Sequence, residues 1–345
     1  MKIKDVRSMK LTMQLKSRSY DIILKAGCLA NLHQFTNVAN RKVFVLTDSG
    51  VPAEYAQTVA AQCPDSTVYT IPRGEGSKCL KVYGQVLQAM LAFGMDRKDL
   101  LVAVGGGVVG DLGGFCAASY MRGIDFVNCP TTVLAQVDSS IGGKVAVDMD
   151  GIKNIVGAFY QPREVMIDPD VLATLDRRQF AAGLCEAIKM AATCDAVLFG
   201  LIEDSRDIDA DLDRVIHGAL MIKRGVVEND PGERGLRRVL NFGHTVGHAV
   251  EGIMNGAWLH GECVAVGMLP MCGGAARKRL CAVLEKYGLP TELPREADAV
   301  RLCDFMRHDK KAAAGGINVV TVGEIGSFEF TKMTPEEIAG RAVTI

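Results

Sequence analysis

Short apolar runs alternate with helical patterns through the first half of the chain. In the helical patterns, which cover residues 80–93 and 110–120, apolar residues recur every three or four positions. The apolar runs are rich in β-branched residues and predict strands at residues 43–47, 67–71, 100–104 and 126–129. Because strands and helices alternate, we expect an α/β fold with a mainly parallel sheet covered by helices.

The pattern changes near residue 176, where long helical periodicities replace the apolar runs. They predict helices at residues 180–203, 212–227, 245–253, 261–278 and 299–308. Residues 317–322 and 327–330 have strand character and predict one hairpin. A chain of 345 residues exceeds the usual size of one hydrophobic core. We therefore expect an α/β domain over residues 1–176 and a mainly helical domain over residues 177–345.

Composition excludes several classes of protein. The net charge is −1, and no long basic run is present to bind nucleic acid or an anionic membrane. No apolar run is long enough to span a membrane, and the first residues lack the apolar core of a signal peptide, so we expect a cytoplasmic protein. The 11 cysteines are scattered without a CxxC pair, which favours free buried thiols and a reducing compartment.

A glycine-rich motif follows the predicted strand at residues 100–104. Gly105, Gly107 and Gly110 match G-x-G-x-x-G, whose backbone approaches a pyrophosphate at the start of a helix. The motif lies well beyond the first strand, which indicates a variant of the Rossmann-like fold. The alternative is a strand-to-helix turn with no ligand. Asp48, which follows another predicted strand, is placed to hold the ribose hydroxyls of NAD and to repel the 2′-phosphate of NADP.

Three of the six histidines cluster in the second half of the chain, at residues 244, 248 and 260. His244 and His248 would share one helix face, and His260 would return from the next helix. Glu186 lies in an apolar stretch and needs a cation, so Glu186, His244 and His260 could bind a divalent metal with one position open. The alternative is that these histidines are ordinary core or surface residues with satisfied nitrogens.

Basic residues near these motifs suggest an anionic ligand. Lys144 follows two glycines, and an ammonium group placed there would attract a small anion, although a solvated loop is the alternative. Lys223 and Arg237 precede the histidine cluster at near-helical spacings and could clamp a phosphate or carboxylate. The pair Lys310-Lys311 also has a simpler interpretation as a solvated helix end.

Taken together, the motifs resemble those of the 3-dehydroquinate synthase family from about Gly74 to Lys311. The matching strings keep the family's order and spacing, and they are GGGVVGDLGGF, RG, PTTVLAQVDSSIGGK, KNIVGAFYQP, AGLCEAIK, GLRRVLNFGHTVGHAVE, HGE and DKK. The resemblance implies an NAD-binding α/β domain, a helical metal- and substrate-binding domain, a cleft site between them, and a homodimer.

The resemblance also implies roles for particular residues. Glu186, His244 and His260 would bind zinc or cobalt, which leaves His248 on the substrate side. Arg122 would reach across the dimer. The other residues expected to contact substrate are Asp138, Lys144, Asn154, Lys189, Lys223, Arg237, Asn241, His248 and Lys310. Those expected to contact NAD are Asp48, Glu75, Lys78, Gly106, Gly107, Val108, Asp111, Thr131, Thr132, Lys153 and Thr174.

The chain departs from the family's usual residues in three places. Gln179 replaces a common Glu and removes a possible cofactor-side carboxylate, Asp148 replaces Asn, and Met190-Ala191 replaces Tyr-Gly. The expected metal ligands and the residues expected to bind the substrate's charged groups are retained.

The implied reaction is that of a carbon–oxygen lyase of the shikimate pathway. It converts 3-deoxy-arabino-heptulosonate 7-phosphate into 3-dehydroquinate and phosphate through transient oxidation by NAD, phosphate elimination, re-reduction and intramolecular aldol closure. The alternatives are another sugar-phosphate cyclase and a metal-dependent polyol dehydrogenase. A non-catalytic ligand-binding protein would show loss of a metal ligand, and none is lost here.

Overall fold

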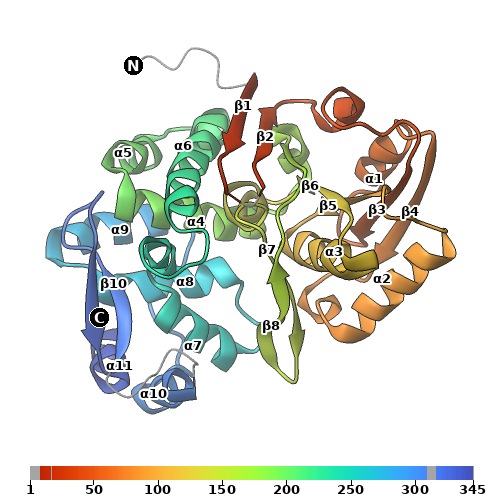
Figure 1. Ribbon diagram of the computed structural model, residues 1–345. Helices are drawn as coiled ribbons and strands as arrows, with labels where there is room; N and C mark the ends of the chain where they lie inside the picture. The colour runs from red at the N-terminus through yellow and green to blue at the C-terminus, as the bar shows by residue number, and fades with distance from the viewer. Residues whose placement is uncertain (1–7, 17, 309–315, 345) are drawn as a thin grey trace. The chain divides into compact units, whose positions relative to one another are not determined.

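The computed structural model describes residues 8–16, 18–308 and 316–344. The chain forms two compact units that divide between Leu175 and Asp176. In Figure 1 the first unit is coloured from red through yellow to yellow-green and the second from green to blue. None of the helices in the described part of the chain is long and apolar enough to cross a membrane.

The first unit is built on a seven-stranded sheet with the order β1-β2-β9-β6-β5-β3-β4. All neighbours are parallel except β1, which pairs antiparallel with β2. This confirms the prediction of a mainly parallel sheet. The strands are β1 Ser8–Met13, β2 Tyr20–Lys25, β3 Lys42–Asp48, β4 Asp65–Ile71, β5 Leu100–Gly105, β6 Asp125–Pro130 and β9 Glu164–Ile167. Four of them were predicted; β1, β2 and β9 were not.

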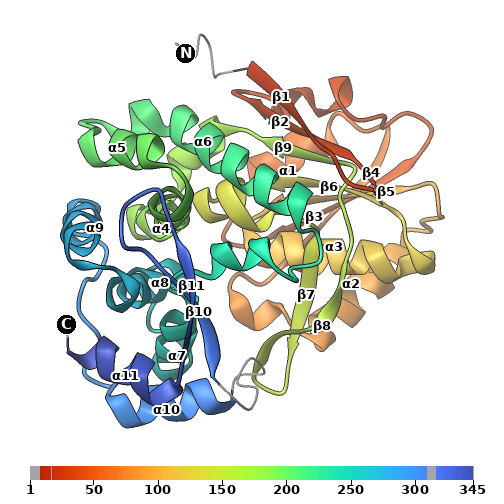
Figure 2. The ribbon, with the colours of Figure 1, turned by 60° about the vertical axis from the view of Figure 1, so that its left-hand side comes forward.

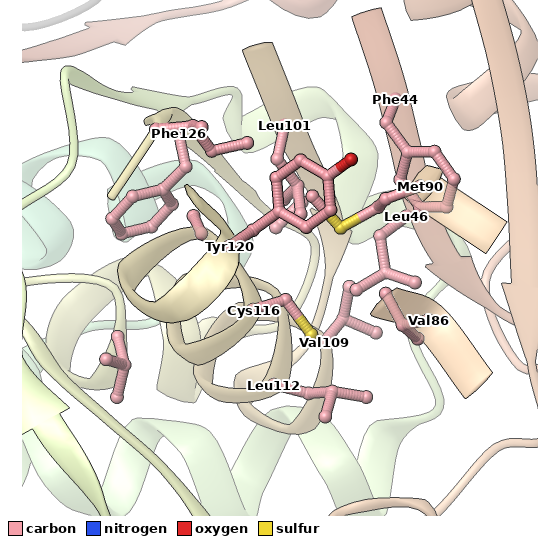
Figure 3. Close-up of a cluster of buried hydrophobic side chains, with 14 of the residues drawn as sticks. Phe44, Leu46, Val86, Met90, Leu101, Val109, Leu112, Cys116, Tyr120 and Phe126 are labelled. Carbon is pink, nitrogen blue, oxygen red and sulfur yellow. The ribbon is translucent and has the colours of Figure 1, made fainter. Parts of the chain in front are cut away.

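Helices cover the sheet and bury its apolar side chains. The regular helices of the first unit are α1 Ala53–Ala60, α2 Leu80–Ala92 and α3 Gly107–Ser119. Side chains of α2, α3 and the strands form one core cluster, in which Leu46, Val86, Leu101 and Leu112 are all buried (Figure 3). At Gly113 of α3 a Cβ atom would lie 3.1–3.2 Å from side chains of β3 and β5, so glycine permits the close approach of helix and sheet.

Two strands that the sequence pattern did not reveal form a separate hairpin in the first unit. β7 (Lys144–Met149) and β8 (Ile152–Phe159) pair antiparallel (Figure 2). At Gly157 a Cβ atom would lie 2.2 Å from the carbonyl oxygen of Val145, so only glycine fits there. Most of β8 is exposed. Its residues therefore lack the alternation of buried and exposed positions by which strands are recognised.

The second unit is mainly helical, as predicted. Its helices are α4 Arg177–Cys194, α5 Ala196–Asp204, α6 Ile208–Asn229, α7 His244–Met254, α8 His260–Met268, α9 Gly274–Lys286, α10 Ala299–His308 and α11 Pro335–Val343. The predicted hairpin is confirmed, because β10 (Ile317–Thr321) pairs antiparallel with β11 (Glu329–Met333). All 11 cysteines are free, which confirms the prediction of free thiols, and eight of them are buried.

Two long helices predicted in this unit are wrong, because each is broken. The stretch 180–203 breaks at Asp195, whose carboxylate accepts the backbone N–H groups of Val197 and Leu198 and so caps the start of α5. The stretch 261–278 breaks after Met268, where the short helix η7 (Leu269–Met271) contains Pro270. In both places local capping or backbone chemistry overrides the apolar periodicity.

Candidate functional site

The carboxyl ends of the parallel strands gather most of the residues predicted to bind NAD. Strand β5 has β6 on one side and β3 on the other, with β4 beyond β3, so the chain order reverses between β3 and β5. Ligands of open α/β sheets bind at such a switch point. Asp48 ends β3 there, and Gly106 and Gly107 follow β5. Thr131 and Thr132 follow the end of β6.

The glycine turn leaves the start of α3 open to a ligand. Gly106 is the N-cap of α3 and provides no side-chain cap, so the first N–H groups of this 13-residue helix remain available to an anion. A Cβ atom at Gly106 would lie 3.1 Å from Thr132 Cγ2, and one at Gly107 would lie 3.1 Å from Ser139 Oγ. A side chain at either position would therefore be crowded, and glycine lets the backbone of this turn lie close to Thr132 and Ser139.

Four predicted NAD residues form a charged network next to this turn. The Lys78 side chain is 6% exposed, and its Nζ lies 2.5 Å from Asp111 Oδ2 and 3.9 Å from Glu75 Oε1. Lys153 Nζ is also 3.9 Å from Glu75 Oε1. Burial alone would lower the pKa of Lys78, but the nearby carboxylates of Asp111 and Glu75 raise it above its usual value. Lys78 is therefore a charged lysine in a buried setting.

Asp148, which departs from the usual asparagine, shapes the neighbouring hairpin. Its carboxylate accepts the backbone N–H of Asn154 at 2.7 Å. Asn154 has a left-handed backbone with a φ of 54°, and this hydrogen bond holds it in that conformation. The Asp148 N–H donates to the carbonyl oxygen of Lys78 at 2.7 Å. Asp148 thus links the hairpin to the segment that carries Lys78.

The remaining predicted residues of the first unit occupy separate elements. Asp138 lies in the π-helix η4 (Ala135–Ser139), and Lys144 is the exposed first residue of β7. Thr174 lies in η5 (Pro169–Thr174), where its hydroxyl is 3.0 Å from the Tyr55 hydroxyl. Arg122 ends η3 (Tyr120–Arg122), where Tyr120 is buried and Arg122 is exposed with a left-handed backbone.

In the second unit, close packing of three helices brings Glu186 of α4, His244 and His248 of α7, and His260 of α8 together. Glycines make this packing possible. A Cβ atom at Gly261 would lie 1.9 Å from the carbonyl oxygen of Ala182 in α4, and one at Gly267 would lie 2.1 Å from the carbonyl oxygen of Gly243. The three imidazole centroids are 5.1, 5.3 and 5.8 Å apart.

Both ring nitrogens of His244 and His260 have defined surroundings. The Nδ1 of His244 lies 3.1 Å from the carbonyl oxygen of Phe242, and the Nδ1 of His260 lies 3.2 Å from Glu251 Oε2. The Phe242 carbonyl oxygen can only accept a hydrogen bond, and so can the Glu251 carboxylate when it is ionised, so both Nδ1 atoms carry the hydrogen. The Nε2 atoms lie 4.0 and 3.6 Å from Glu186 Oε1, which is too far for a hydrogen bond.

Glu186 supplies the observation that tests whether a metal fits. Its Oε1 is buried and has no hydrogen-bond partner among the described residues. A buried carboxylate oxygen without a partner is costly. Ligand atoms about 2.1 Å from a tetrahedral zinc ion are roughly 3.4 Å apart. The separations of 3.6 and 4.0 Å from Oε1 to the two Nε2 atoms are close to that value, so Glu186, His244 and His260 fit a divalent ion.

The charge states of these groups follow from their surroundings. Burial would raise the pKa of Glu186, but Lys189 and the two imidazoles hold it well below its usual value, so the carboxylate is ionised. Burial and the Lys189 ammonium lower the pKa of His244, so it is neutral and can donate a lone pair. Burial opposes protonation of His260, yet Glu186 and Glu251 raise its pKa to about 10. A metal would therefore displace a proton from His260.

His248 is the exposed member of the cluster. Its ligand nitrogen and those of His244 and His260 lie within 4.8 Å of one another. The geometry thus brings four potential donors together, counting Glu186. That His248 does not bind the ion, and contacts substrate instead, stays a prediction. Among the four, Glu186 has the strongest need for the ion, because its buried Oε1 has no hydrogen bond among the described residues.

The predicted anion-binding residues lie on elements around this cluster. Lys189 donates to Glu186 Oε2 within α4, and both side chains are almost fully buried. Lys223 of α6 and Arg237 of η6 (Leu236–Asn241) are also buried. Asn241 Nδ2 donates to Glu233 Oε1 at 3.0 Å. The prediction for Lys310 falls outside the described residues.

Sequence reasoning missed two carboxylates that organise the predicted residues. Asp230 accepts the backbone N–H groups of Arg234, Gly235 and Arg237 at 2.7–2.9 Å and so closes the loop before Arg237. The Asn-Asp-Pro-Gly string at residues 229–232 was the available turn signal. Glu251 lies seven residues after His244 on the same helix, a spacing that places both on one face.

Comparison with known proteins shows which family this chain resembles. Residues 68–182 match the family described as 3-dehydroquinate synthase N-terminal, and residues 183–312 match 3-dehydroquinate synthase C-terminal. The 3-dehydroquinate synthase of Pelobacter propionicus is 41% identical over 95% of this chain and 97% of its own length.

Two solved structures share the fold. The structure of 2-deoxy-scyllo-inosose synthase complexed with carbaglucose-6-phosphate, NAD+ and Co2+ covers 97% of this chain and 100% of its own, with a TM-score of 0.89 and 24% identity. ValA, the 2-epi-5-epi-valiolone synthase of Streptomyces hygroscopicus with NAD+ and Zn2+ bound, covers 96% of this chain and 98% of its own, with a TM-score of 0.85 and 28% identity. The fold class predicted from the sequence is confirmed.

Proposed function

The chain belongs to the 3-dehydroquinate synthase family, and we propose that it converts 3-deoxy-arabino-heptulosonate 7-phosphate into 3-dehydroquinate and phosphate. The observation that carries the proposal is the buried Glu186 Oε1, which has no hydrogen bond among the described residues and faces the Nε2 atoms of His244 and His260. It is joined in the same chain by an open glycine turn at the switch point of the sheet. Identity of about 40% to 3-dehydroquinate synthases over nearly the full chain supports this substrate.

We propose NAD and a zinc or cobalt ion as the cofactors. NAD would accept a hydride from the substrate alcohol and return it within one turnover, and the ion would act as a Lewis acid on substrate hydroxyls. Glu186, His244 and His260 would hold the ion. The NAD phosphates would lie against the N–H groups of Gly107 and Val108.

NAD-binding roles for the remaining residues of the first unit follow the same reasoning. Asp48 would accept hydrogen bonds from ribose hydroxyls and disfavour a 2′-phosphate. Lys78, held charged by Asp111 and Glu75, would attract the cofactor's negative charge. Lys153, Thr131, Thr132 and Thr174 complete the proposed set.

The substrate's carboxylate and phosphate require cationic partners. We assign these roles to Lys223 and Arg237, since burial of both side chains strengthens their interaction with an anion. Asn241 would fix a neighbouring hydroxyl or carboxylate oxygen. His248, as the exposed imidazole, would contact the substrate. Asp138, Lys144, Asn154, Lys189 and Lys310 keep the substrate-contacting roles implied by the family.

A homodimer and a cytoplasmic location are also part of the proposal. Arg122 is exposed on a turn where Met121 and Arg122 both have left-handed backbones. Such strain costs of order 1–3 kcal/mol per residue and persists where a conformation is needed. In the proposed homodimer, this strained conformation would direct the Arg122 side chain toward the second copy of the chain.

One assay tests the function directly. The purified protein, supplied with NAD and Co2+, should release phosphate from the heptulosonate phosphate without net accumulation of NADH. Chelation should stop turnover, and added Co2+ or Zn2+ should restore it. NADH growing in proportion to product would instead favour a polyol dehydrogenase. Equal turnover of a heptulose phosphate that lacks the carboxylate would favour another sugar-phosphate cyclase.

A further inference from the structure

Glu251 makes a contact that sets His260 apart from the other proposed ligands. It lies on α7, two turns after His244, and its Oε2 is 3.2 Å from His260 Nδ1. The Glu251 side chain is 12% exposed, so this carboxylate is largely removed from water. Within the described part of the chain, the acceptor at this nitrogen comes from α7 and not from α8, which carries His260.

His260 needs this contact more than His244 does. Its side chain is 31% exposed, whereas that of His244 is 12% exposed. Both histidines are the first residues of their helices, α7 and α8, so the two differ in exposure and not in position along the helix. The His244 ring, by contrast, bonds the carbonyl oxygen of Phe242, which is fixed in the same chain two residues away. Packing therefore restrains the His260 ring less.

We propose that Glu251 is a positioning residue that holds the His260 imidazole with Nε2 directed toward Glu186 and thereby strengthens metal binding. The acceptor at Nδ1 selects the tautomer whose Nε2 lone pair is available to an ion. A carboxylate acceptor also increases the basicity of the ligating nitrogen. The inference rests on the metal site of the proposed function and extends it to a residue that would not touch the ion.

The test is the affinity of the protein for Co2+, measured by competition with a chromophoric chelator. Glu251→Met keeps the bulk of the side chain and removes the acceptor, and it should weaken Co2+ binding about 10- to 100-fold. Glu251→Gln retains an oxygen that can accept the Nδ1 hydrogen without the charge. It should lose less affinity than the methionine variant, since neutral hydrogen bonds are weaker.

A matched control separates positioning from general destabilisation. Glu203 also bonds across two helices, to Arg279 with Nε–Oε1 at 2.9 Å, and Glu203→Met should leave Co2+ affinity unchanged. Thermal unfolding of the metal-free proteins should show Glu251→Met folded. The visible absorption of bound Co2+ gives a second readout, because a rotated His260 ring changes the ligand field in Glu251→Met and not in the control.

The outcomes are distinct. Wild-type affinity in Glu251→Met would overturn the inference, and so would a glutamine variant as weak as the methionine variant. Equal losses in Glu203→Met and Glu251→Met would also overturn it, by pointing to a non-local effect. Failure of the wild-type protein to bind Co2+ at all would overturn the metal site of the proposed function, and the inference with it.

Discussion

Gly261 in α8 lies against Ala182 in α4 so closely that a Cβ atom on Gly261 would be 1.9 Å from the Ala182 carbonyl oxygen. The neighbouring residue His260 faces Glu186, which is four residues after Ala182 in α4. The contact between these two helices therefore sets the distance between two of the proposed metal ligands. The atoms of Ala182 that a Cβ on Gly261 would meet belong to the backbone, so they could not move aside as the end of a flexible side chain could.

We expect Gly261→Ala to separate α8 from α4 and to weaken Co2+ binding at least tenfold. The overpacked contact should also lower the free energy of unfolding by about 1–3 kcal/mol. Thermal unfolding and chelator competition would measure the two effects. Gly274→Ala, at a helix position where a Cβ atom would meet nothing within 4 Å, is the control and should change neither. Normal metal binding by Gly261→Ala would contradict the role given to this contact.

The ion pair between Lys189 and Glu186 supports a second prediction. Lys189→Met removes the main cation beside a carboxylate that is 1% exposed. We expect the metal-free protein to lose about 3 kcal/mol of unfolding free energy. That value is the low end for a broken buried pair, because His260 Nε2 at 3.6 Å from Glu186 Oε1 still supplies positive charge.

Saturating Co2+ should reverse much of this loss, since the ion would take over the neutralisation of Glu186. Unfolding curves with and without Co2+ would show a larger metal-induced shift in Lys189→Met than in the wild type. Lys278→Met, at an exposed position of α9, should stay within about 0.5 kcal/mol of the wild type. If Co2+ raised the free energy of unfolding of Lys189→Met by no more than it raised that of the wild type, the result would argue against an ion at Glu186.

A third prediction concerns acid stability of the first unit. Burial would raise the pKa of Asp125, but Arg18, with Nη2 at 2.6 Å from Asp125 Oδ1, and Arg41 hold it below the ordinary value of 3.8. The carboxylate therefore contributes stability above pH 3.8, and this contribution is lost as the pH falls through the lower folded pKa. Asp125→Asn should cost about 1 kcal/mol at pH 7. Denaturant titrations should show the gap closing as the pH falls below 3.8 and through the lower folded pKa; a gap that persists in stronger acid would contradict the ion-pair explanation.

Sequence patterns predicted the parts of the fold that depend on burial. The strands β3, β5 and β6 are buried along nearly their whole length and appear as apolar runs, so they were found. The edge strand β4 is mostly not buried and was found from its β-branched residues. The hairpin β7–β8 was missed because β8 is mostly exposed. The break at Pro270 was missed because apolar residues continue past it, although the proline itself was visible.

The sequence allowed the proposed metal ligands to be predicted, but not the residues that hold the site residues in position. The spacing of His244 and His248 places both on one helix face, and this required only helical geometry. That His260 returns to Glu186 depends on the contact of Gly261 with Ala182, which is a property of packing. Asp230 and Glu251 act through hydrogen bonds to a loop and to a ring nitrogen. The sequence alone does not show that Asp230 bonds this loop or that Glu251 bonds the His260 ring, because both contacts depend on the folded chain.

The last prediction concerns Asp230, which organises the loop that leads to Arg237. Its carboxylate accepts the backbone N–H groups of Arg234, Gly235 and Arg237, and the Arg237 Nη1 donates to the carbonyl oxygen of Pro231 at 2.9 Å. Asp230→Ala removes the acceptor for three donors, so the loop should lose the conformation that directs Arg237.

We expect Asp230→Ala to lower kcat/KM for the heptulosonate phosphate at least tenfold, while Co2+ affinity stays at the wild-type value. Arg237→Ala should show the same split, because losing a charged hydrogen bond to the substrate costs on the order of 1.5–3 kcal/mol. In the double variant the two losses should be less than additive, since both act through one guanidinium. Asp209→Asn, which removes only an exposed contact with Arg177, is the control. Fully additive losses in the double variant would show that Asp230 acts independently of Arg237.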